Sequence, residues 1–210
     1  MVDGRRYPAA EKQADDAMND SDMQHQERKR AMDFIVKQGR PEDFNKRPEK
    51  EQRIYEFLDD LGVDYVYLDH QEEYSMGDAA DADEAIGVVG AKNVFLRDKK
   101  RRHYVLILVN GTKRVDLKKI SELTGFKQLT FCHESDLDEV LGLTPGAVTP
   151  FGLLNDRENK VQLIIDESLR DEELFAMHPC VNTTTVRMSN HDFMDVVIPA
   201  MGHEPIFTEI

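Results

Sequence analysis

The sequence predicts an α+β fold with a mixed β-sheet flanked by helices. Predicted strands occur both singly and in hairpins, with helical segments between them. Residues 161–166 form a mainly apolar segment, which is typical of a strand that is buried on both faces. The helical segments carry start and stop residues, such as Asp116 before 117–123 and Gly142 after 136–141. This mixture of single strands, hairpins and capped helices favours α+β over an all-helical or all-β class.

The folded part is predicted to begin at Pro48, because proline is favoured in the first turn of a helix. Apolar residues then recur at helical spacing as far as Gly62, which ends the helix. A short strand over 64–69 follows, and a capping box at 75–78 leads into another helix. The remaining predicted elements, in order, are strands 93–98 and 103–109, helix 117–123, strand 129–131, helix 136–141, strands 161–166 and 183–188, and a final helix around 193–198 capped by Ser189.

Residues 1–47 are predicted to be a charged extension, helical or disordered, ahead of a domain over 48–210. Basic and acidic residues nearly balance in this segment, and apolar residues are sparse. A helix over 11–37 is compatible with the pattern, and Gly39-Arg40-Pro41 would interrupt it. This composition offers little apolar surface to bury, so we expect the extension to dock loosely at most.

Composition excludes several classes of protein. The chain has 210 residues and a formal net charge of −14, which argues against a general nucleic-acid coat protein. No apolar run approaches the ~20 residues of a membrane helix, and no leader pattern is visible, so no membrane partner is expected. Cys132 and Cys180 form no C-x-x-C pair, which indicates neither a disulfide framework nor a metal site. We interpret Cys180 as a buried, inert thiol and expect no metal or cofactor, which fits a reducing cytoplasm.

Positive charge is concentrated in residues 92–127. This segment holds eleven Lys or Arg against three Asp or Glu, a net charge of +8. A basic segment in an acidic protein can attract a polyanion locally. The four consecutive cations Lys99, Lys100, Arg101 and Arg102 lie at a predicted hairpin turn, and solvated surface is the alternative interpretation for them. No helix-turn-helix pattern is visible, so DNA is not the expected partner.

The segment from Thr144 to Gly152 predicts an unusual bend. Pro145-Gly146 is a turn dipeptide in which glycine is free to adopt positive φ. Pro150 removes one backbone donor and favours an extended conformation at Thr149. Backbone N–H groups left unpaired in such a bend can bind an oxyanion or a phosphate. An ordinary loop between a helix and a strand is the alternative.

Two further places carry candidate chemistry. Lys92-Asn93 stands at a strand entry after a glycine-containing turn, where an ammonium could reach a phosphate or an ester. His178 and Asn182 lie four residues apart at a predicted strand start, where they could orient a hydroxyl and a carbonyl. An ordinary surface lysine and a structural His–Asn pair are the corresponding alternatives.

Taken together, these motifs resemble those of the freestanding prolyl-tRNA editing proteins of the YbaK/ProX group, which includes the editing domain inserted in bacterial prolyl-tRNA synthetases. The resemblance covers roughly residues 50–210 and follows the family's order and spacing. It rests on Lys92 to Leu96, Pro145 to Leu153, Asn155-Asp156, and His178-Pro179 with Asn182-Thr183. It implies an α+β editing domain that hydrolyses mischarged aminoacyl-tRNA, most often Ala-tRNA(Pro).

The resemblance also implies roles for individual residues. Catalytic roles are implied for Lys92, Gly146 and His178; substrate binding for Asn93, Ala147, Val148, Thr149, Pro150 and Asn182; and tRNA binding is expected for Lys99, Lys100, Arg101 and Arg102. The family's chemistry implies assistance from the terminal ribose hydroxyl of the tRNA. No Ser-His-Asp triad or metal cluster is evident in the sequence, so no covalent or metal-dependent step is implied. A pocket that admits alanine and excludes proline would select by size.

The implied partners are the acceptor end of mischarged tRNA(Pro) and prolyl-tRNA synthetase, in the cytoplasm. An alternative function stays open from the sequence: a catalytically silent module that senses prolyl-tRNA or proline and acts through a partner. Hydrolysis of Ala-tRNA(Pro) separates the two hypotheses.

Overall fold

The computed structural model describes residues 34–72, 76–88 and 91–210. Residues 34–210 form one compact unit. Most of the predicted helix over 11–37 lies outside the described residues, and its end is corrected by the structure, because Val36 and Lys37 belong to a strand. The predicted capping residue Ser75 also lies outside the described residues. No helix in the described ranges is long and apolar enough to cross a membrane.

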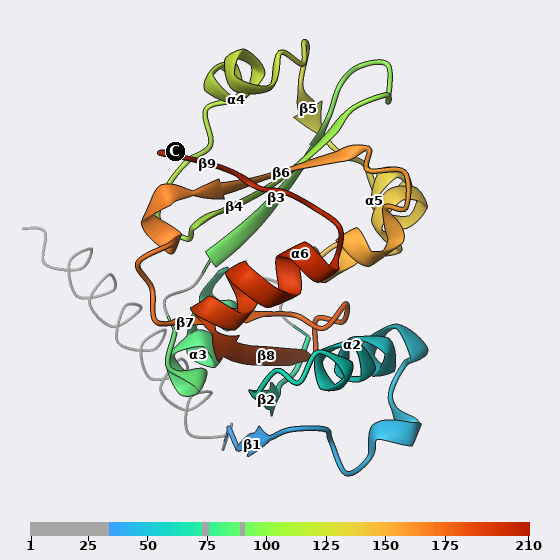
Figure 1. Ribbon diagram of the computed structural model, residues 1–210, viewed down its shortest axis with the longest axis vertical. Coiled ribbons are helices and arrows are strands. Elements are labelled where there is room, and N and C mark those ends of the chain that lie inside the picture. The colour runs from blue at the N-terminus through green and yellow to red at the C-terminus, as the bar shows by residue number, and fades with distance from the viewer. Residues whose placement is uncertain (1–33, 73–75, 89–90) are drawn as a thin grey trace, which may run out of the picture. The chain divides into compact units, whose positions relative to one another are not determined.

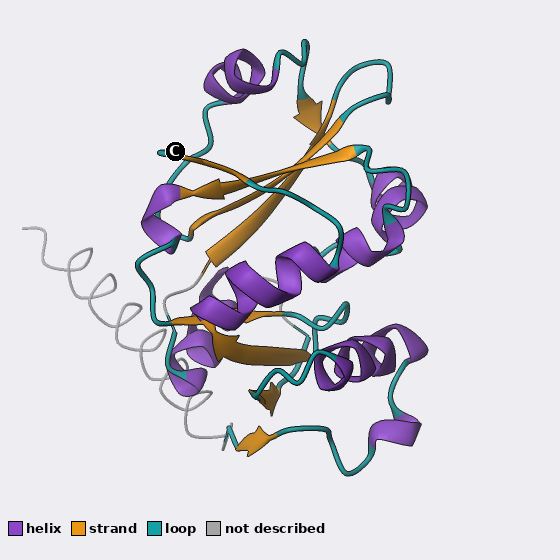
Figure 2. Ribbon diagram, viewed as in Figure 1, coloured by secondary structure: helices purple, strands orange, loops and turns teal. Residues whose placement is uncertain are grey.

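Helices are interspersed with single strands and strand hairpins along the chain (Figures 1 and 2). The strands are β1 (Val36–Gln38), β2 (Tyr65–Asp69), β3 (Ala91–Arg97), β4 (Tyr104–Asn110), β5 (Thr130–Phe131), β6 (Val161–Asp166), β7 (Leu174–Met177), β8 (Thr184–Ser189) and β9 (Ile206–Thr208). The α-helices are α2 (Glu49–Asp60), α3 (Met76–Ile86), α4 (Leu117–Thr124), α5 (Glu134–Leu141) and α6 (Ile198–Ala200). Short 3₁₀ helices are η1 (Phe44–Lys46), η2 (Pro150–Asn155) and η3 (Glu167–Leu169), and η4 (Asp192–Val197) is a π-helix.

The described strands form two sheets, which confirms the α+β class. One sheet is antiparallel with the order β1-β2-β8-β7. The other sheet is mixed and has the order β5-β3-β4-β6-β9. Its strands β4, β6 and β9 run parallel to one another. The mixed sheet agrees with the prediction. The separate antiparallel sheet adds to it, because strand partners depend on contacts between distant segments.

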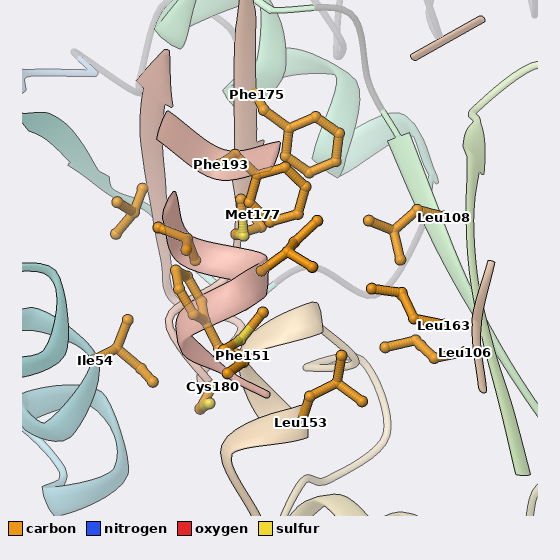
Figure 3. Close-up of a cluster of buried hydrophobic side chains, with 14 of the residues drawn as sticks. Ile54, Leu106, Leu108, Phe151, Leu153, Leu163, Phe175, Met177, Cys180 and Phe193 are labelled. Carbon is orange, nitrogen blue, oxygen red and sulfur yellow. The ribbon is translucent and has the colours of Figure 1, made fainter. Parts of the chain in front are cut away.

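The main core lies between the two sheets. Leu106, Leu108 and Leu163 of the mixed sheet belong to the same buried cluster as Phe175 and Met177 of the antiparallel sheet. The helix formed by η4 and α6 runs between the sheets and contributes Phe193 to this cluster (Figures 1 and 3). The rings of Phe175 and Phe193 stack with centroids 4.2 Å apart. Apolar side chains on facing elements thus bury each other from both sheets.

Both faces of the mixed sheet are covered. Alternate residues of β4 point to opposite faces, so Leu106 enters the main core while Ile107 joins a second cluster. In that second cluster Ile120 of α4 packs on the sheet. The predicted two-faced burial of β6 is confirmed by Leu163 in one cluster and Ile164 in the other.

Local sequence features fix several element ends as predicted. Asp116 accepts a hydrogen bond from the Lys118 amide at the start of α4, at 2.8 Å. Gly125 and Gly142 adopt positive φ at the ends of α4 and α5. The final helix departs from expectation, since η4 is π-helical before Pro199 in α6. Pro199 lacks an N–H and cannot complete a regular α-helical hydrogen bond, which accounts for part of this departure.

Residues 34–47, the last part of the predicted extension, contact the rest of the compact unit. Strand β1 pairs antiparallel with β2, from Val36 opposite Leu68 to Gln38 opposite Val66. Arg47 forms ion pairs with Glu51 and Asp69, each at 2.7 Å. This segment is therefore joined to the domain by both backbone and side-chain contacts.

Candidate active site

Lys92 and Asn93 lie near the start of strand β3, at the strand entry that the sequence predicted. The amide of Asn93 donates a hydrogen bond to the carbonyl of Val148 at 2.9 Å. The ammonium of Lys92 donates to the carbonyl of Gly111 at 3.0 Å. Alternation along the strand sends the two side chains to opposite faces. Asn93 is thus joined to the segment 144–152, whereas Lys92 is held on the turn that follows β4.

Gly146 lies in a tight turn at the start of that segment. The amide of Ala147 donates to the carbonyl of Thr144 at 3.1 Å. Gly146 has φ of +84°, a value that glycine adopts without strain. Pro145 and Gly146 therefore occupy the central positions of a type II-like turn. The predicted positive φ at Gly146 is confirmed.

Three backbone amides in this segment have no partner among the described residues. The N–H groups of Gly146, Val148 and Thr149 make no hydrogen bond there. Thr149 is fully buried, and its hydroxyl also has no partner within the described chain. Its backbone is extended before Pro150, as predicted. Gly146 is exposed and Val148 is half-buried, so only the buried Thr149 carries the cost of an unpaired polar group. Unpaired N–H donors beside it are typical of a site that binds a ligand through the backbone.

The next residues hold this segment in place. The side chain of Asn155 donates to the carbonyl of Leu141 at 2.7 Å and accepts from Arg53 at 2.7 Å. The carboxylate of Asp156 accepts from the amides of Lys160 and Val161 at 3.0 and 2.7 Å. Asn155 and Asp156, which belong to the motif recognised in the sequence, thus stabilise the loop.

His178 and Asn182 lie in the connection between β7 and β8, rather than at a strand start as expected. Strand β8 begins only at Thr184, and Cys180 adopts φ of +64° within the connection. His178 Nδ1 lies 3.0 Å from the carbonyl of Thr184, so Nδ1 carries the proton and donates. In the neutral ring, Nε2 is then the acceptor. The side chain of Asn182, half-buried, makes no hydrogen bond to another described residue.

Cys180 lies beside these residues but is not a nucleophile. The thiol is 4% exposed, and burial raises its pKa to about 12. The thiolate, which is the reactive form, is therefore scarce at neutral pH. The interpretation of Cys180 as an inert thiol agrees with these properties. Cys180 and Phe151 both belong to the main core (Figure 3).

The predicted tRNA-binding cations lie at the turn between β3 and β4. Lys99, Lys100 and Arg102 are exposed there. Arg101 is already engaged, because its guanidinium contacts the Asp136 carboxylate at 2.6 Å and the Ser135 hydroxyl at 3.0 Å. Five residues of β3 and Asp98 separate Lys92 from Lys99, a span of ~20 Å. The structure therefore places the turn apart from the Asn93–Val148 contact.

Comparison with known proteins identifies the family. The model of the aminoacyl-tRNA editing domain family matches residues 70–196. The chain belongs to this family. Its predicted enzyme class, an aminoacyl-tRNA deacylase, is thereby confirmed, since editing is the hydrolysis of an aminoacyl-tRNA ester. The matched range contains every site residue predicted from the sequence.

Individual relatives agree with this assignment. The chain is 33% identical to the prolyl-tRNA editing protein ProX of Acetoanaerobium sticklandii, over 72% of this chain and 92% of that protein. It is 28% identical to the prolyl-tRNA synthetase associated domain-containing protein 1 of Mus musculus, over 76% of this chain and 94% of that protein. A solved structure described as a candidate trans-editing enzyme for prolyl-tRNA synthetase has the same fold, with a TM-score of 0.58, 20% identity, and coverage of 78% of this chain and 99% of that one.

One residue near the site escaped the sequence analysis. His70 follows β2 directly, and its ring lies 5.6 Å from that of His178, measured between centroids. The two histidines are far apart in the sequence, so no spacing rule connects them. A histidine directly after a predicted strand, next to Asp69, was the available hint.

Proposed function

We propose that this chain is a trans-editing hydrolase that cleaves the aminoacyl ester of mischarged tRNA(Pro), with Ala-tRNA(Pro) as its substrate. One observation carries the chemical part of this proposal: the unpaired amides of Gly146, Val148 and Thr149 in the turn tied to Asn93. Ester hydrolysis develops negative charge on the carbonyl oxygen, and preorganised N–H donors stabilise that charge. The names of the prolyl-tRNA editing relatives support the choice of tRNA.

In this proposal, His178 acts on a hydroxyl group. Its Nδ1 proton is directed at the Thr184 carbonyl, so Nε2 presents a lone pair to the attacking water or to the terminal ribose hydroxyl. Asn182 supplies an amide for the substrate carbonyl or amine. Lys92 leaves the Gly111 carbonyl to neutralise the acceptor-end phosphate. Proton transfer by a positioned side chain contributes typically 10²–10⁴-fold to such reactions.

Selection between amino acids follows from the walls of the loop. Ala147 and Thr149 are buried, and Pro150 is held rigid at the start of η2. We infer that Ala147, Val148, Thr149 and Pro150 surround the aminoacyl group and admit alanine more readily than proline. Selection by size alone is worth about 1–3 kcal/mol per methylene.

The exposed cations at the β3–β4 turn are proposed to contact tRNA phosphates. Lys99, Lys100 and Arg102 supply these contacts, with Arg101 holding the turn on α5 through Asp136. The enzyme would act in the cytoplasm, where prolyl-tRNA synthetase generates the substrate. The salt dependence of binding should become weaker when the three exposed cations are neutralised, by roughly 0.7–0.9 in slope for each phosphate that the protein no longer neutralises.

Deacylation of Ala-tRNA(Pro) and Pro-tRNA(Pro) tests the proposal. Wild-type protein should hydrolyse the alanyl ester and spare the prolyl ester. Lys92→Ala should lower kcat/KM by roughly 10²-fold or more, the scale of removing one preorganised electrostatic interaction, without a change in thermal melting. Lys118→Ala, on exposed α4, is the matched control. Binding of either tRNA without hydrolysis would instead favour the silent sensing module.

A further inference from the structure

The antiparallel sheet brings two histidines to the same end. Strand β8 lies between β2 and β7 in this sheet. His70 follows the last residue of β2, and His178 follows the last residue of β7. Since both strands run antiparallel to β8, these two positions flank its first residues. Residues separated by more than a hundred positions in the sequence thereby become neighbours.

Three consecutive threonines fix the two histidines. The carbonyl of Thr183 accepts from the backbone amide of His70 at 2.9 Å. The carbonyl of Thr184 accepts from Nδ1 of His178 at 3.0 Å. The hydroxyl of Thr185 lies 3.0 Å from Nε2 of His70. The entry of β8 therefore fixes both the backbone and the ring of His70, and the ring of His178.

The hydrogen bonds assign the tautomer of His70. Its Nδ1 lies 2.7 Å from the carbonyl of Gln71, which can only accept, so Nδ1 carries the proton. In the neutral ring, Nε2 then accepts from the Thr185 hydroxyl. His70 is thus bound at both nitrogens and presents its ring to His178 in one orientation. The ring planes meet at 46°.

We propose that His70 is a positioning residue for the hydrolysis: its ring limits rotation of the His178 imidazole and keeps Nδ1 of His178 on the Thr184 carbonyl. Nε2 of His178 thereby stays directed at the substrate hydroxyl. The inference rests on the proposed function, because His178 acts on the substrate only there. A histidine that merely closes a strand end would contribute stability and leave the turnover of folded enzyme unchanged.

Steady-state deacylation kinetics test this role. His70→Ala should lower kcat about 10-fold with little change in KM, since a misplacement of about 1 Å can cost up to 10²-fold in rate. The combined His70→Ala and His178→Ala variant should be no slower than His178→Ala alone, because the first residue acts through the second. His191→Ala, an exposed histidine paired with Asp195, is the matched control and should turn over like wild type. Multiplicative losses in the double variant would overturn the proposal.

A spectroscopic measurement separates this proposal from the proposed function. The ¹⁵N shifts of the His178 ring report which nitrogen carries the proton. Wild-type protein should show the Nδ1–H form, and His70→Ala should show a mixture with the Nε2–H form. An unchanged His178 tautomer in His70→Ala would overturn the positioning role even if the enzyme is active. Absence of deacylation by wild-type protein would instead remove the proposed function and leave this structural test standing.

Thr185→Val provides a second variant if His70→Ala folds poorly. Valine keeps the shape of threonine and removes the hydroxyl that holds Nε2 of His70. It should reduce kcat in the same direction as His70→Ala, by roughly 3-fold, as expected for an indirect loss of orientation. Full activity of a folded Thr185→Val protein would contradict the assigned role of this hydrogen bond.

Discussion

The two halves of the segment 144–156 differ in whether their polar groups have hydrogen-bond partners. In the first half, the amides of Gly146, Val148 and Thr149 have no hydrogen-bond partner within the described residues. In the second half, the side chains of Asn155 and Asp156 are bonded to backbone groups. Both halves belong to one continuous sequence motif. The hydrogen-bond partners therefore separate residues that are proposed to serve the substrate from residues that hold the loop.

The difference in hydrogen bonding has a consequence for stability. The Thr149 hydroxyl is buried without a partner in the described chain, which costs about 1–3 kcal/mol, so the first half is less stable than the same segment with that group paired. The paired second half offsets that cost by fixing the loop to α5 and β6. Variants in the second half should then change stability, and variants in the first half should change activity.

The largest expected effect is on stability, from Asp156→Ala in the second half. This variant removes the acceptor of the Lys160 and Val161 amides and the partner of His203, which lies 3.1 Å away. We expect a loss of roughly 3–5 kcal/mol in the free energy of unfolding, measured by denaturant titration. Asp156→Asn, which keeps one acceptor oxygen, should lose less. An Asp156→Ala protein as stable as wild type would contradict the structural role assigned to the second half.

Gly146→Ala should show the complementary effect. A Cβ at a φ of +84° strains the turn and displaces the neighbouring amides. We expect kcat/KM for Ala-tRNA(Pro) to fall roughly 10- to 100-fold, on the scale of one missing oxyanion donor. The free energy of unfolding should fall by only about 1–2 kcal/mol, the cost of left-handed backbone at one residue with a Cβ. A large loss of stability with normal turnover would assign Gly146 to the structural half instead.

Gly152→Ala marks the boundary between the halves. A Cβ at this position would lie 2.8 Å from Cδ1 of Leu143 and 3.0 Å from Cβ of Leu141. We expect a destabilisation of about 1–3 kcal/mol from overpacking, seen as a lower denaturation midpoint. The rate per folded molecule should stay near wild type. A selective fall in rate would extend the functional half as far as Gly152.

Thr149→Val is expected to have the smallest effect on stability and activity, and it separates the two roles most directly. The hydroxyl of Thr149 is buried without a partner in the described chain, so its removal should leave stability unchanged or raise it by up to ~1 kcal/mol. If the hydroxyl contacts the substrate, kcat/KM should fall about 3- to 10-fold, the size of one neutral hydrogen bond. Destabilisation by Thr149→Val would show that the hydroxyl has a structural partner.

Local chemistry determined much of this protein from the sequence. Asp116, Gly125 and Gly142 fix helix ends because capping and positive φ depend only on nearby backbone. The mainly apolar composition of β6 indicated that side chains on both of its faces would be buried. The sequence also predicted the bend at Gly146, which depends on neighbouring residues, and the family, which depends on motifs in a fixed order.

Only the tertiary structure decided which distant segments meet. It divided the strands between two sheets and added β1, β7 and β9, whose short sequences carry no strong periodic pattern. It joined Arg101 to Asp136 and placed His70 beside His178. Such contacts follow from strand pairing and from packing between elements. These are non-local interactions, and no sequence spacing encodes them.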